Sequence, residues 1–209
     1  MVGETWEKLM SLCLCEVKIP CGGRLLAKLT LLLGGARSGK SRFAQELANA
    51  QSGAVVYIAT AQTLDAEMMQ RVEKHRRERP AHWHTLELPL DVAKGYRQSG
   101  LKPAVVILDC LTLLVSNAIL AACSGEEVEM GKAQAAVDRE VEALIELIRS
   151  DVAQWILVSN EVGMGLVPPY PLGRAYRDAL GITNQRLAAI ADEVYLLVAG
   201  IPLPLHPYR

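Results

Sequence analysis

The sequence predicts an α/β fold in which a mostly parallel sheet is covered by helices on both faces. Short apolar runs alternate with longer segments of helical periodicity, and the first run leads directly into a glycine-rich loop. The chain has 209 residues and 51% hydrophobic content, which is enough for one substantial core and too little for two ordinary domains. We therefore expect one catalytic domain over residues 29–209, preceded by an N-terminal extension of unassigned role at residues 1–28.

Five apolar runs are the expected strands: Leu29–Leu33, Val55–Ala59, Ala104–Leu108, Trp155–Ser159 and Val194–Val198. The expected helices are Arg42–Ala50, Asp65–Glu78, Glu126–Ser150 and Thr183–Asp192. The proline cluster at 168–171 is expected to stiffen a loop. In an open parallel sheet, ligands bind beyond the carboxyl ends of the strands, so the residues that follow each run are the ones where chemistry is expected.

The loop behind the first strand matches the phosphate-binding pattern G-x-x-x-x-G-K-[ST]. It comprises Gly34, Gly35, Ala36, Arg37, Ser38, Gly39, Lys40 and Ser41. The glycines allow successive backbone N–H groups to point at phosphate oxygens, Lys40 reaches the β and γ phosphates, and the Ser41 hydroxyl is a ligand for Mg²⁺. A strand precedes this loop and a helix follows it, so the predicted ligand is a nucleoside triphosphate.

Asp109 is a second candidate ligand for Mg²⁺. It closes the run Val105–Leu108, and an aspartate at the tip of a buried strand is typical of the Walker B acid. The alternative is a cap for a helix that begins near Thr112. The phosphate loop favours the metal role, and the absence of N-K-x-D and D-x-x-G patterns argues against a signalling-type GTPase.

His75 lies in a basic segment, Arg71–Pro80, that ends a helical pattern. One interpretation is a solvated helix end whose positive charge complements the helix dipole. The other is that the guanidinium groups neutralise a polyphosphate while a neutral imidazole nitrogen attacks phosphorus and forms a nucleotidyl-histidine. Spacing alone leaves both interpretations open.

Composition excludes several classes of partner. A net charge of −1 provides no field that would hold nucleic acid or an anionic membrane. The sequence has no apolar run of roughly 18 residues to span a bilayer, and Glu4 and Glu7 stand where a secretory signal carries positive charge, so we expect a cytoplasmic protein. The five cysteines are an odd number, and the three nearest the N-terminus lack a fourth zinc ligand, so ordinary reduced thiols are expected.

Taken together, six groups of residues resemble the family of bifunctional adenosylcobinamide kinases and adenosylcobinamide-phosphate guanylyltransferases of cobalamin biosynthesis. They are residues 34–41, 57–62, His75 with 79–83, 107–112, 159–165, and 184–188 with 191–194. The resemblance implies phosphorylation of adenosylcobinamide, followed by transfer of GMP from GTP to the new phosphate through a guanylyl-histidine. It also implies Mg²⁺ as a cofactor, with GTP and ATP as substrates and a corrinoid as the small-molecule partner. The implied architecture is a RecA-like P-loop sheet that assembles as a homotrimer.

By the same resemblance, His75 is the catalytic histidine, because it stands in the family's H-x-x-x-R-P context. The implied nucleotide contacts are residues 34–41 together with Thr60, Ala61, Gln62, Arg76, Arg77, Glu78, Arg79, Glu87 and Asp109. Two rival functions use the same loop. One is a small-metabolite or nucleoside monophosphate kinase with Arg71–Arg79 as a closing lid, and the other is a RecA-like regulatory ATPase.

Overall fold

The computed structural model describes residues 29–62, 73, 76, 79–123 and 130–205. Within these residues one seven-stranded sheet has the order β3-β2-β4-β5-β1-β6-β7, and only the β6–β7 pair is antiparallel. The strands are β1 (Leu29–Gly34), β2 (Val55–Ala59), β3 (His84–Glu87), β4 (Val105–Asp109), β5 (Gln154–Val158), β6 (Glu193–Val198) and β7 (Ile201–Leu205). The predicted α/β class, a mostly parallel sheet with helices on both faces, is confirmed, and all five expected strands are present to within one residue at each end.

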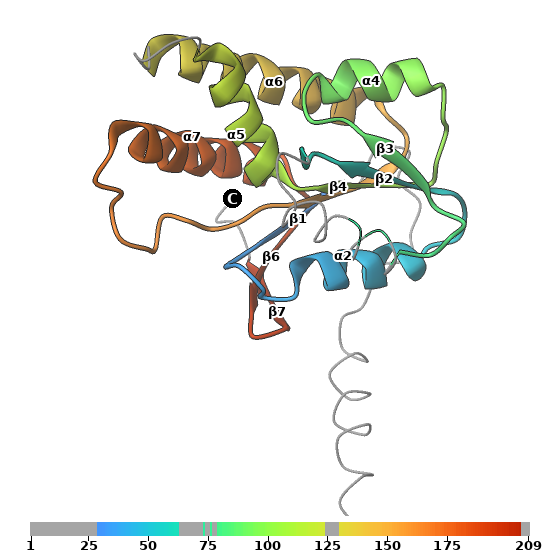
Figure 1. Cartoon of the computed structure of the whole chain (residues 1–209). Helices are drawn as coiled ribbons and strands as arrows, with labels where there is room; N and C mark the ends of the chain where they lie inside the picture. Colours follow the sequence, from blue (N-terminus) through green and yellow to red (C-terminus); the bar gives the residue numbers. More distant parts are fainter. Residues whose placement is uncertain (1–28, 63–72, 74–75, 77–78, 124–129, 206–209) are drawn as a thin grey trace, which may run out of the picture.

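Helices cover both faces of this sheet, as predicted (Figure 1). On one face lie α4 (Val92–Ser99), α5 (Leu111–Ala122), α6 (Met130–Ser150) and α7 (Pro171–Ala188), and on the other lies α2 (Lys40–Asn49). Successive side chains of a strand point to opposite faces, so two apolar layers form. Ile58 and Leu108 pack in the layer under α4 to α7, whereas Tyr57 and Ile107 pack in the layer under α2.

The turn between β1 and α2 depends on two glycines with positive φ. Gly34 has φ 150°, and a Cβ there would lie 2.5 Å from the carbonyl oxygen of Leu197 on the neighbouring strand β6. Gly39, with φ 97°, occupies the N-cap of α2 in the left-handed region, where glycine carries no steric penalty. The chain therefore leaves the sheet tightly and starts α2 directly at the strand end.

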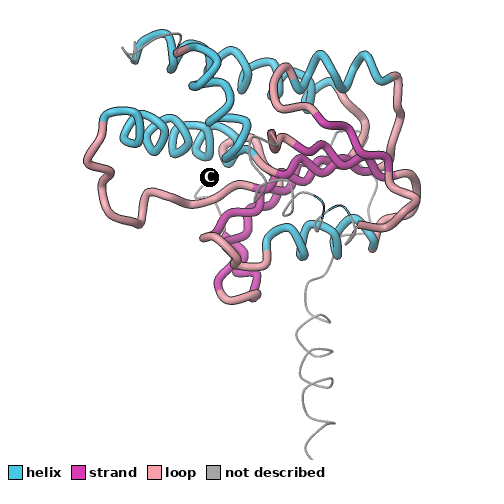
Figure 2. The backbone as a smooth tube through the Cα atoms, viewed as in Figure 1, coloured by secondary structure: helices cyan, strands magenta, loops and turns pink. Residues whose placement is uncertain are grey.

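Four elements are absent from the expected strands and helices: β3, β7, α4 and α5, the last of which is expected only in the alternative interpretation of Asp109. The last expected helix is also wrong in extent, because α7 begins at Pro171 and ends at Ala188. Pro171 lies in the first turn of α7, where its missing N–H costs no hydrogen bond. The proline cluster therefore ends the long β5–α7 loop, which Figure 2 shows, and leads into a helix.

The expected helix Asp65–Glu78 lies almost wholly outside the described residues. The two members that are described, Glu73 and Arg76, are helical and exposed. Of the expected helix Glu126–Ser150, residues 126–129 are outside the described part, and the rest forms α6.

Candidate functional site

The phosphate loop is closed around the side chain of Lys40. This side chain is buried, and its Nζ donates hydrogen bonds to the carbonyl oxygens of Gly34 (3.0 Å) and Gly35 (2.6 Å) and to Ser38 Oγ (3.4 Å). Burial lowers the pKa of Lys40, while the nearby charge of Asp109 acts in the opposite direction. An ammonium group held in the middle of the loop is preorganised to bind phosphate oxygens without a large rearrangement.

Two neighbouring strand ends brace the loop from outside. The backbone N–H of Glu161, after β5, donates to the carbonyl oxygen of Gly34 at 3.1 Å. The N–H of Gly200, in the β6–β7 turn, donates to the carbonyl oxygen of Ser38 at 2.9 Å. Gly35, Ala36 and Arg37 between these anchors are exposed, so the backbone that the motif assigns to phosphate faces outward.

Asp109 ends β4 beside the same loop and is half-buried. The Tyr57 hydroxyl on the adjacent strand β2 donates to Asp109 Oδ2 at 2.6 Å. Burial and the charge of Asp109 both raise the pKa of Tyr57, so the phenol stays protonated and remains a donor. The alternative role for Asp109 is a cap for a helix near Thr112. That helix, α5, begins at Leu111, but its N-cap is Cys110, which makes no side-chain hydrogen bond to it.

Thr60 follows β2 and is fully buried. Its hydroxyl donates to the carbonyl oxygen of Cys110 (2.7 Å) and accepts from the Cys110 N–H (2.9 Å). Its own carbonyl oxygen accepts from Asn117 Nδ2 at 2.9 Å. Thr60 therefore ties β2 to the start of α5, while Ala61 and Gln62, both half-exposed, continue toward solvent.

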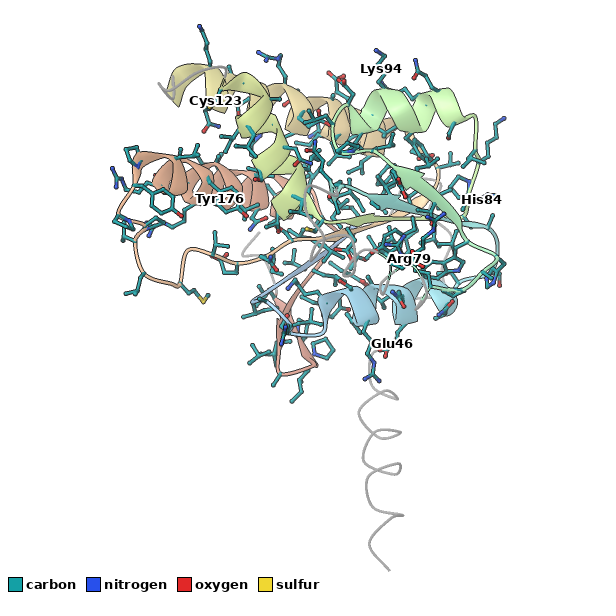
Figure 3. The ribbon with its side chains drawn as sticks, viewed as in Figure 1. Glu46, Arg79, His84, Lys94, Cys123 and Tyr176 are labelled. Atoms are coloured by element: carbon teal, nitrogen blue, oxygen red, sulfur yellow. The ribbon has the colours of Figure 1, made fainter. Side chains whose placement is uncertain are left out.

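Arg79 lies on the α2 side of the sheet (Figure 3). Its guanidinium carbon is 3.7 Å from the centroid of the Tyr57 ring, and Trp83 stacks near the same ring with centroids 6.5 Å apart. Arg79 Nε and Trp83 Nε1 are both buried and have no hydrogen-bond partner in the described part of the chain. A buried donor without a partner is costly, so these two nitrogens are candidate donors to a ligand.

The structure therefore brings together Lys40, Asp109 and Arg79 of the expected site, with Tyr57 between the last two. Glu87 is exposed at the end of β3, the strand that pairs with β2, and Ser41 is half-buried in the first turn of α2. His75, Arg77 and Glu78 lie outside the described residues.

Three buried polar residues at this end of the sheet were given no individual role from the sequence: Tyr57, Asn117 and Asn184. Asn184 Oδ1 accepts from Ser159 Oγ (2.7 Å), and its Nδ2 donates to the carbonyl oxygen of Asn160 (3.1 Å). The available signal was an amide inside an otherwise apolar helical stripe, because such a group must find partners when it is buried.

The described part of the chain contains no cluster of three or more His, Cys, Asp or Glu side chains placed to hold a metal ion. Burial raises the pKa of Cys110 to about 11, which makes this thiol unreactive at neutral pH. None of the described helices is both long and apolar enough to cross a membrane.

Comparison with known proteins identifies the family. The model of the family "Cobinamide kinase / cobinamide phosphate guanyltransferase" matches residues 30–205. The bifunctional adenosylcobalamin biosynthesis protein CobP of Pseudomonas aeruginosa is 45% identical over 175 residues, covering 84% of this chain and 95% of CobP. CobU of Salmonella typhimurium is 42% identical over 177 residues, covering 83% of this chain and 97% of CobU.

Among solved structures, the flagellar accessory protein FlaH of Methanocaldococcus jannaschii aligns at 16% identity with a TM-score of 0.40, covering 84% of this chain and 73% of FlaH. The family match decides against both rival functions, the metabolite kinase and the regulatory ATPase. On its sequence and on its P-loop sheet, this chain belongs to the cobinamide kinase / cobinamide phosphate guanylyltransferase family of bifunctional enzymes.

Proposed function

We propose that this enzyme phosphorylates adenosylcobinamide with ATP or GTP and then transfers GMP from GTP to adenosylcobinamide phosphate, through a guanylyl-histidine at His75, giving adenosyl-GDP-cobinamide. The observation that carries the proposal is the convergence of a closed phosphate loop, a strand-end carboxylate and an arginine whose buried Nε has no partner among the described residues, at one end of the sheet. The matched family supplies the two reactions and the corrinoid substrate class.

In the kinase step, the chain's own residues position the triphosphate and neutralise its charge. Lys40 already occupies the centre of the loop, where its ammonium exchanges loop carbonyl oxygens for β- and γ-phosphate oxygens. The exposed backbone at residues 35–37 supplies further N–H donors. Phosphoryl transfer depends mainly on such positioning, so a strong general base for the substrate hydroxyl is not required.

Mg²⁺ fits the donor set at this strand end. One carboxylate, Asp109, and one hydroxyl, Ser41, follow the strand and the loop that bind the triphosphate, and Mg²⁺ in nucleotide sites commonly takes few protein ligands and keeps several waters. When bound, the ion neutralises charge on the β and γ phosphates. Tyr57 engages Asp109 Oδ2, so the other carboxylate oxygen is the one left for the ion.

In the transfer step, a nitrogen of the His75 imidazole forms a bond to the α phosphorus of GTP, and the bond to pyrophosphate breaks. An oxygen of adenosylcobinamide phosphate then attacks the same phosphorus and releases the histidine. We assign Arg76, Arg77, Glu78, Arg79 and Glu87 to the nucleotide, along with residues 60–62. Support for Arg79 comes from its buried Nε, which lacks an acceptor within the described residues.

We further propose a homotrimer that acts in the cytoplasm, where nucleoside triphosphates are available. Apolar side chains exposed on the β6–β7 hairpin support self-association: Val198, Ile201, Leu203 and Leu205 are between 43% and 60% exposed. Multi-angle light scattering measures the assembly, and a monomer at micromolar concentration would contradict the trimer.

The intermediate is tested by incubating the protein with Mg²⁺ and GTP radiolabelled at the α phosphate, followed by denaturing electrophoresis. We expect acid-labile, base-stable label on the wild type and none on His75→Ala. His82→Ala, at an exposed histidine seven positions along, is the matched control and should retain full labelling. Label that survives in His75→Ala would remove the histidine from its proposed role.

A further inference from the structure

Tyr57 makes contacts with residues from both parts of the proposed site. Its hydroxyl donates to Asp109 Oδ2 at 2.6 Å, and its ring lies under the Arg79 guanidinium at 3.7 Å. Asp109 belongs to the part that holds the triphosphate and the metal, whereas Arg79 belongs to the basic segment that includes His75. One side chain therefore joins two groups that are 30 residues apart in the sequence.

The position of the Tyr57 ring is fixed by the sheet. Tyr57 is 2% exposed, and in the parallel β2–β4 pair it stands opposite Ile107, so Asp109 lies two residues further along β4 on the same face. Trp83 packs against the ring at an interplanar angle of 25°. Neither partner of Tyr57 is fixed as firmly, since Asp109 and Arg79 are only half-buried.

Without the Tyr57 hydroxyl, the Asp109 carboxylate would still be attracted to a second group, the Lys40 ammonium. Asp109 interacts electrostatically with the Lys40 ammonium, which is the central cation of the phosphate loop. A carboxylate released from Tyr57 is expected to turn toward this cation, and it would then be less available to the metal. We therefore expect the hydrogen bond from Tyr57 to hold the Asp109 carboxylate in place against this attraction.

We propose that Tyr57 is a positioning residue for both halves of the site: its hydroxyl orients Asp109 toward the metal, and its ring holds Arg79 toward the nucleotide. This inference rests on the proposed roles of Asp109 and Arg79. The proposal gives the hydroxyl and the ring of Tyr57 different functions. The hydroxyl acts only on metal-dependent binding of nucleotide, and the ring acts also on binding without metal.

The test is calorimetric titration of GTP into the full chain, once with Mg²⁺ and once with EDTA. Tyr57→Phe should weaken GTP binding about tenfold in Mg²⁺, the effect of losing a hydrogen bond to a charged group, and leave the EDTA value unchanged. Tyr57→Leu should weaken binding about tenfold in EDTA as well, because the cation–π contact with Arg79 is also lost. Tyr96→Phe is the matched control, because Tyr96 also forms a hydrogen bond to an aspartate, Asp151, and packs on a tryptophan, Trp155. Tyr96 lies in the other apolar layer, away from the site. Tyr96→Phe should change neither value.

A double-mutant cycle keeps the proposal testable if Tyr57→Leu does not fold. In an Asp109→Asn background, Tyr57→Phe should cost less than twofold further in Mg²⁺, because the hydroxyl acts through the carboxylate. The proposal would be overturned if Tyr57→Phe weakened GTP binding equally in Mg²⁺ and in EDTA, or if this variant bound GTP more tightly than the wild type in Mg²⁺. These readouts need no turnover, so failure of the guanylyl-histidine and failure of this inference are distinguishable.

Discussion

Replacing Asn117 removes two hydrogen bonds that hold the carboxyl ends of two strands against a helix. Asn117 lies on α5, is buried, and donates from Nδ2 to the carbonyl oxygens of Thr60 and Pro89, each at 2.9 Å. These carbonyls follow β2 and β3, so one amide fastens two strand ends to one helix. Leucine has a similar volume and no donor.

The magnitude follows from the two bonds. Each lost hydrogen bond costs about 1 kcal/mol, and a carbonyl left without a partner in a buried site raises this cost, so Asn117→Leu should lose about 2 to 4 kcal/mol of unfolding free energy. For a chain of this size that corresponds to a fall in Tm of roughly 5 to 15 °C. Asn117→Asp should lose more, because it places a carboxylate against two carbonyl oxygens.

The assay is urea unfolding followed by circular dichroism, with Asn49→Leu at the exposed end of α2 as the control for the exchange itself. The Michaelis constant for GTP should rise in Asn117→Leu, because residues 60–62 lose their support. An Asn117→Asp protein as stable as the wild type would refute the reasoning, since no arrangement of donors would then be needed at this position.

Three further predictions concern the loop and its surroundings. Lys40→Met should weaken GTP binding about 100-fold, as seen by calorimetry, with little change in Tm, because the buried ammonium is already poorly solvated. Gly34→Ala should lower Tm, since its Cβ would lie 2.5 Å from the Leu197 carbonyl oxygen. Gly181→Ala in α7, where a Cβ meets open space, should raise the free energy of unfolding by about 1 kcal/mol. A Gly34→Ala protein more stable than Gly181→Ala would contradict both expectations. Burial raises the pKa of Cys110 from about 9 to about 11 on folding, so its contribution to stability is complete below pH 9 and falls as pH rises toward 11. Between pH 8 and 10.5, the free energy of unfolding measured in urea should therefore fall by about 2 kcal/mol less in Cys110→Ala than in the wild type.

The central strands could be predicted because each is an apolar run that the sheet buries on both faces. The edge strands could not. In β3, His84 and Glu87 are exposed, and β7 alternates prolines with half-exposed apolar residues, so neither shows the continuous burial of the interior strands. Helix α5 lacks a polar face because the sheet, α6 and α7 surround it, and its sequence therefore carries no amphipathic period.

The site divides in the same way. The loop at residues 34–41 and the strand-end position of Asp109 could be predicted, because a loop motif and a strand-end acid are local patterns, while the ligands assigned to them stay predictions. The contacts of Tyr57 could not, because its approach to Asp109 depends on the register of β2 against β4, and its approach to Arg79 depends on how the chain returns from the basic segment to the sheet. The assignments of His75, Arg77 and Glu78 stay predictions.

The proposed guanylyl-enzyme provides the decisive measurement. Wild-type protein labelled from GTP at the α phosphate is freed of nucleotide by gel filtration and then mixed with adenosylcobinamide phosphate, without GTP. We expect the label to leave the protein and appear in adenosyl-GDP-cobinamide in a single turnover. Label that stays on the protein, or is released only as GMP, would contradict a guanylyl-histidine on the path to product.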